Sequence, residues 1–144
     1  MNTSMLTAAL LLIPSSLSTS AKDKHLPLPP QLISAKSVYI DNQSGAPKPG
    51  DQAYQELSAW GRFQVVQDKS QVDLIFRLTA YSATEGNIWG PPSVNAYSVL
   101  TVLDAKTGQT LWTDSKYTGR WTIKNTIADL RKRIEEETAV PKKH

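Results

Sequence analysis

The clearest pattern along the chain is an alternation over residues 72–81, in which every second residue is apolar and the residues between are Asp73, Ile75, Arg77 and Thr79. The apolar positions are Val72, Leu74, Phe76, Leu78 and Ala80. A period of two residues is typical of a strand with one buried face. Four further short runs, rich in β-branched and aromatic residues, predict strands at residues 37–41, 63–67, 96–103 and 109–117.

Two segments have the spacing of amphipathic helices. Asp51 is a candidate N-cap for a helix that continues to Trp60 and is closed by Gly61. Near the C-terminus a narrow apolar stripe repeats at i, i+4, i+7 and i+11, at Ile123, Ile127, Leu130 and Ile134. We expect this second helix to pack on a sheet rather than to bind a partner.

The predicted order of elements is β-α-β-β-β-β-α. A helix between the first two strands favours a βαβ-type crossover, and the tight turn at residues 104–108 predicts a hairpin of the last two strands. We therefore expect a single α/β (α+β) domain over residues 36–138. Its mixed sheet of about five strands carries both helices on one face. A long loop is expected at residues 82–95.

The ends of the chain differ in composition from this domain. Residues 1–21 lack charge and contain an apolar run at 6–13 followed by Pro14 and small residues, the layout of a cleaved secretory signal peptide. An uncleaved anchor and a disordered N-terminus remain alternatives. Residues 22–35 predict an extended Pro-rich linker, and residues 139–144 a disordered tail. The expected location is the periplasm or the exterior of the cell, with no membrane span after cleavage.

Charge and cysteine content exclude several classes of function. The net charge is +3, but residues 22–121 hold ten Lys and Arg against nine Asp and Glu, so no broad basic face exists for nucleic acid. The chain has no cysteine, which removes disulfides, thiolate metal sites and lipid attachment at a cysteine. We expect no nucleic-acid partner, no metal site and no cofactor.

Three motifs in the domain resemble those of a group of small bacterial envelope domains. They are Gly61-Arg-Phe-Gln-Val-Val66, Val72-Asp-Leu-Ile-Phe76, and the hairpin from Asp104 through Thr107-Gly108 to Trp112. They are similar to motifs of the TolB N-terminal domain, the curli-secretion lipoprotein CsgG and the lipoprotein activators of penicillin-binding proteins. The resemblance covers residues 36–134 and implies a non-enzymatic accessory role. Val72 stands where those families usually have Ala.

Candidate catalytic groups are few. His25 lies in the Pro-rich segment and His144 is the last residue, so neither suits a catalytic triad. A carboxylate pair for hydrolysis would have to come from Asp41, Asp104, Asp114 or Glu85. Asp104 has a simpler role, because its side chain can accept backbone N–H bonds in the turn that follows it. We expect no catalytic residues.

Aromatic residues are the remaining candidates for function. Trp89 lies in the expected long loop, where it either anchors the loop or contacts a partner. The sequence therefore predicts an exported, non-enzymatic envelope module that binds an envelope protein or a second copy of itself. One alternative is a glycan or peptidoglycan binder that uses Trp89, Tyr97 and Trp121. A second alternative is a small hydrolase with a carboxylate pair.

Overall fold

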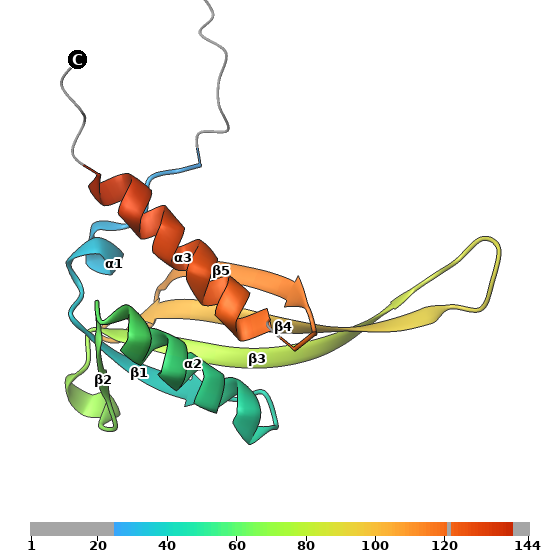
Figure 1. Ribbon diagram of the computed structural model, residues 1–144, viewed down its shortest axis with the longest axis horizontal. Coiled ribbons are helices and arrows are strands. Elements are labelled where there is room, and N and C mark those ends of the chain that lie inside the picture. The colour runs from blue at the N-terminus through green and yellow to red at the C-terminus, as the bar shows by residue number, and fades with distance from the viewer. Residues whose placement is uncertain (1–24, 121, 140–144) are drawn as a thin grey trace, which may run out of the picture.

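The sheet has five strands and lies at the centre of the structure. A computed structural model describes residues 25–120 and 122–139. The strands are β1 (Ser37–Asn42), β2 (Gln64–Val66), β3 (Leu74–Glu85), β4 (Ser93–Asp104) and β5 (Thr110–Tyr117). Their order in the sheet is β2-β1-β3-β4-β5, with β1 parallel to β2 and β3 and the remaining pairs antiparallel (Figure 1). The predicted α+β fold with a mixed five-stranded sheet is confirmed.

Helices cover one face of this sheet. They are α1 (Pro30–Ser34), α2 (Pro47–Trp60) and α3 (Thr122–Thr138), and a short 3₁₀ turn η1 (Lys69–Gln71) precedes β3. Figure 1 shows α2 and α3 side by side over the sheet. As the sequence predicts, Gly61 ends α2 in a left-handed conformation with φ 71°, and its N–H donates to the Leu57 carbonyl.

The main core lies between the helices and the sheet. From β3 it takes Leu74, Phe76 and Leu78, which are almost wholly buried and point to the helix side. The apolar stripe of α3 packs in the same cluster, as expected. Because neighbouring residues of a strand point to opposite faces, Ile75 lies on the other face, in a small second cluster to which α1, α2 and α3 contribute no residue.

The Pro-rich segment belongs to the fold. The described part of the expected linker, residues 25–35, contains α1 and places Leu28, Leu32 and Ala35 in the core. Pro30 lies at the start of α1, where its missing N–H is not needed and its fixed φ favours a helical turn. The expectation of an extended linker over these residues is therefore wrong. The expected signal peptide at 1–21 and most of the expected tail lie outside the described residues.

Two other boundaries differ from the prediction. Helix α2 begins at Pro47 with Ala46 as N-cap, so Asp51 lies inside the helix and is not its cap. Half of the expected loop at 82–95 is strand, because β3 continues to Glu85 and β4 begins at Ser93. Most residues there are small or carry a hydroxyl group, so the sequence shows no alternation of apolar and polar positions. The strands are recognised only from the register in which β3 and β4 pair.

We expect Leu32→Ala to lower the free energy of unfolding by about 2–5 kcal/mol, since it opens a cavity in a fully buried site. Leu26→Ala is the matched control, because the Leu26 side chain is 87% exposed and its loss should change stability by less than about 0.5 kcal/mol. Urea unfolding of both variants measures the difference. Equal stability of the two would show that α1 is not part of the core.

Candidate functional site

The β3–β4 hairpin extends far beyond the rest of the sheet. Strand β1 ends at Asn42, opposite Leu78, and β5 ends at Tyr117, opposite Tyr97. Residues 81–97 therefore form a two-stranded ribbon, here called the arm, which projects from the body (Figure 1). An isolated two-stranded ribbon is at best marginally stable in water. Exposed apolar residues on such a ribbon do not stabilise the fold, so they are candidates for contact with another molecule.

The tip of the arm presents two large apolar side chains. Ile88 is 91% exposed and Trp89 is 93% exposed, in the turn that joins β3 to β4. The backbone N–H of Trp89 donates to Asn87 Oδ1 at 3.1 Å, which fixes the local turn. Val94 is also largely exposed, and Glu85 is the only charged residue of the arm. The arm is an apolar and almost uncharged projection.

A row of three tyrosines crosses the base of the arm. Tyr81, Tyr97 and Tyr117 are direct neighbours on β3, β4 and β5 and lie on the face without helices. The rings of Tyr81 and Tyr97 stack at 5.1 Å with 14° between their planes, and Tyr117 meets Tyr97 edge to face at 6.0 Å. The Tyr97 hydroxyl donates to Glu85 at 2.9 Å, and this bond raises the Tyr97 pKa. The row stiffens the point where the arm leaves the sheet.

The structure does not bring the sequence candidates together. Trp89 is at the tip and Tyr97 is at the base of the arm. Tyr97 lies four residues along β4 from Ser93, which belongs to the last pair of the ribbon, and Trp89 lies beyond that pair. At about 3.3 Å per residue, Tyr97 and Trp89 are therefore more than about 13 Å apart. The exposure of Trp89 contradicts the loop-anchoring interpretation. Trp121 lies outside the described residues. Sequence reasoning missed Tyr81, which the alternation of β3 places on the same face as Tyr97.

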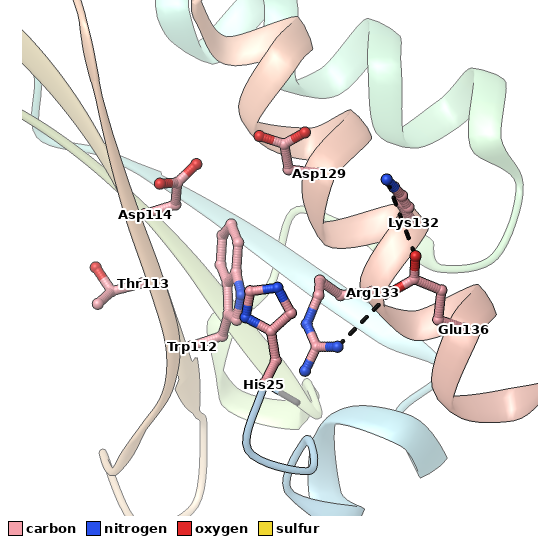
Figure 2. A pocket seen from close by; sticks show the side chains of 8 residues that line it. All are labelled: His25, Trp112, Thr113, Asp114, Asp129, Lys132, Arg133 and Glu136. Atoms are coloured by element: carbon pink, nitrogen blue, oxygen red, sulfur yellow. Dashed lines mark ion pairs between the residues drawn. The ribbon is translucent and has the colours of Figure 1, made fainter. Parts of the chain in front are cut away.

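One cavity, with a volume of about 440 Å³, lies between β5 and α3. Figure 2 shows the side chains around it: His25, Trp112, Thr113, Asp114, Asp129, Lys132, Arg133 and Glu136. The main-chain carbonyl of Leu26 accepts a bond from Arg133 at 2.9 Å, which holds the N-terminal segment against α3 beside this cavity.

The carboxylates of this cavity are already paired with cations. Lys116 Nζ lies 2.6 Å from Asp129 and 3.2 Å from Asp114. The Asp129 contact is the main cause of a raised Lys116 pKa. Glu136 lies 3.7 Å from Arg133 and 4.0 Å from Lys132 (Figure 2). Neutralised acids of this kind are poor general bases and leave little net charge to recognise a ligand.

Asp73 and Asp104 line a second cavity of about 310 Å³ together with Lys36 and Lys106. Asp73 accepts bonds from the backbone N–H groups of Lys36 at 2.8 Å and Ser37 at 3.1 Å. The Lys36 bond is the main cause of a lowered Asp73 pKa. A glycosidase needs one carboxyl with a raised pKa to act as the acid, and Asp73, whose pKa is lowered, does not meet that need.

Asp41 and Asp104, two of the carboxylates expected for a hydrolase, do not meet. Asp104 accepts the N–H groups of Lys106 and Thr107, which confirms its expected role in the turn. Asp41 forms an ion pair with Arg77 at 2.9 Å. The register places Asp41 on the helix-free face and Asp104, opposite Leu74, on the helix side. The two carboxylates are thus on opposite faces of the sheet.

Residues 25–120 and 122–139 hold no group of three or more His, Cys, Asp or Glu side chains arranged to bind a metal ion. Within the same ranges, no helix combines the length and apolar content needed to cross a membrane.

No protein-family model matches the chain, and no curated protein matches it. Solved structures are similar in shape at low identity. Lipoprotein GNA1162 from Neisseria meningitidis is 13% identical over 70% of this chain and 99% of that one, with a TM-score of 0.38. An uncharacterized lipoprotein B from Nitrosomonas europaea is 16% identical over 78% and 82%, with a TM-score of 0.38. The LpoB C-terminal domain from Salmonella enterica is 12% identical over 60% and 84%, with a TM-score of 0.39.

Two of these three proteins are lipoproteins by name. Scores of this size support no conclusion about the function of the present chain. The resemblance to the TolB, CsgG and activator families stays a prediction.

Stability should depend on pH through Asp73. Hydrogen bonds to its charged form lower its folded pKa, so the carboxylate stabilises the fold above its ordinary pKa of 3.8, and this contribution is lost as the pH falls. The unfolding free energies of the native protein and Asp73→Asn should therefore differ most near neutral pH and converge in acid. Urea unfolding at several pH values measures both. A difference that is independent of pH would contradict this role.

Replacing Trp89 by Ala should leave the melting temperature within about 2 °C of the native value, because an exposed side chain contributes little to the core. Trp60→Ala is the matched control. Trp60 packs edge to face on Phe63 at 5.2 Å, so its loss should lower stability by about 2 kcal/mol or more. Thermal unfolding followed by circular dichroism distinguishes them. Comparable losses in both variants would mean that Trp89 is packed.

Proposed function

We propose that this chain is a non-enzymatic interaction module of the bacterial cell envelope, and that the arm is the surface with which it binds a protein partner. The observation that carries this proposal is the exposure of Ile88 and Trp89 at the tip of a projecting ribbon. Large aromatic and aliphatic side chains that insert into a pocket dominate the binding energy of protein interfaces.

The shape and charge of the arm support the same role. A narrow convex tip fits a groove or pocket of another molecule better than a flat surface. The tyrosine row stiffens the base of the arm, which reduces the conformational entropy that binding has to overcome. A single charged residue, Glu85, leaves little to desolvate when the arm is covered.

The chemistry of the cavities supports a role without catalysis. In the β5–α3 cavity each carboxylate faces a cation, and in the second cavity Asp73 and Asp104 are occupied by backbone N–H groups. The envelope location in this proposal rests on the expected export signal at residues 1–21.

The glycan alternative has less support from the geometry. A sugar ring stacks on an open aromatic face, but one face of the Tyr97 ring is stacked on Tyr81, and Tyr97 also makes an edge-to-face contact with Tyr117. Trp89 is too far from Tyr97 to extend a common platform. The arm is therefore better suited to a protein partner than to a polysaccharide.

Photo-crosslinking in intact cells tests the proposal. We expect benzoylphenylalanine at position 89 to yield discrete covalent adducts with protein, because the tip is covered by a partner in the cell. The matched control carries the same amino acid at Ser58, which is exposed on α2. That position should yield none. Equal labelling at both positions, or none at position 89, would contradict the proposal.

A further inference from the structure

One edge of β3 has no neighbouring strand. The Leu78 carbonyl faces β1 and accepts from the Gln43 N–H at 2.8 Å. Backbone groups of every second residue in a strand face the same edge. The N–H and C=O groups of Ala80, Ser82 and Thr84 therefore face the side that β1 has left, and no strand of the described chain pairs with them there.

This open edge lacks the usual protection. Edge strands that remain monomeric are commonly guarded by charged side chains, proline or a bulge. Residues 79–84 have no charged side chain and no proline, and the register of β3 with β4 is continuous from Leu74 to Glu85. The opposite edge of the arm is shorter. Thr118 donates to the Ala96 carbonyl, and Pro91 and Pro92 precede β4.

We propose that the partner of the arm is a second copy of this chain, paired antiparallel along the open edge of β3 about a two-fold axis at Ser82. This inference rests on the proposed function, because it names the molecule that pairs with the edge of the arm.

The backbone of the edge is complementary to itself in this register. Ser82 lies opposite Ser82 of the second copy, and Ala80 lies opposite Thr84 on both sides of the axis. All three are residues whose N–H and C=O groups face outward. Each opposed pair exchanges two hydrogen bonds, which makes about six bonds and satisfies every outward group from Ala80 to Thr84.

The side chains fit the same register. On the helix side Ala80, Ser82 and Thr84 are all small, and on the other face Tyr81 lies opposite the small side chain of Ala83. The two copies of Glu85 are separated by six residues of strand, about 20 Å, so they do not repel strongly. The tyrosine row of each copy then continues across the axis as a shared aromatic surface.

The fold also limits the length of this pairing. Strand β1 occupies the position beside Leu78, so a second chain cannot continue along β3 beyond Thr79. Each arm must leave the plane of the sheet after Glu85, where Gly86 follows. Such a short interface implies weak association. When the protein concentration is varied from about 1 to 500 µM, dimers should therefore form mainly at the highest concentrations.

A charge exchange at the axis tests this register with the full-length chain. Ser82→Lys and Ser82→Glu each place like charges opposite each other, so each protein alone should dimerise at least about tenfold more weakly than the native protein. An equimolar mixture of the two should restore the association. Sedimentation velocity across the concentration range measures all four samples: the native protein, the two variants and their mixture.

Two further variants separate the edge from the rest of the arm. Ser82→Pro removes an outward N–H without touching the β3–β4 hydrogen bonds, so it should give a monomer with native thermal unfolding. Ala96→Lys is the control. It adds charge directly across the ribbon from Ser82, on the opposite edge, and should leave the dimer intact.

The outcomes distinguish this inference from the proposed function. A native protein that stays monomeric throughout, or dimers unaffected by the Ser82 variants, would overturn the inference. A mixture of Lys and Glu variants that fails to associate would overturn the antiparallel register. Crosslinking from position 89 to a different protein would support the proposed function while the inference fails. If the protein forms neither crosslinks from position 89 nor dimers, both the proposed function and this inference are wrong.

Discussion

The fold depends on the burial of one face of β3 beneath α2 and α3. Leu74, Phe76 and Leu78 make that face, and the helices that cover it bring their own apolar stripes to the same cluster. Strand β3 is central, with β1 on one side and β4 on the other. The remaining elements are arranged around this contact: α1 closes one end of the core, and β5 extends the sheet beneath α3.

The arm arises because β3 and β4 are longer than the layer that covers them. After Leu78 the residues on the helix side change to Ala80, Ser82 and Thr84, which need no cover. The same point is where β1 ends, so the loss of the core and the loss of one neighbouring strand coincide. The chain thus has a stable domain that positions a projection with little stability of its own, a common division between scaffold and binding element.

Much of the architecture follows from the periodicity of the chain. The alternation in β3, the helical spacing of the C-terminal stripe and the turn after Asp104 each act locally, so the sequence predicts them. Features set by distant contacts are different. Leu32 lies in a short helix and is buried among core residues from distant parts of the chain, and Tyr97 acquires its neighbours through register with two other strands. Trp89 stands out in the sequence, but its exposure depends on how far the ribbon continues beyond the sheet.

The turn at the tip of the arm has a consequence for the integrity of the chain. It lies near the middle of the described sequence, is exposed, and is bounded by strands that pair with each other over twelve residues each. The main core contains residues from both sides of this turn. A single proteolytic nick at the tip would therefore produce two fragments that stay bound to each other, and two halves expressed separately would have a route to reassemble into one domain.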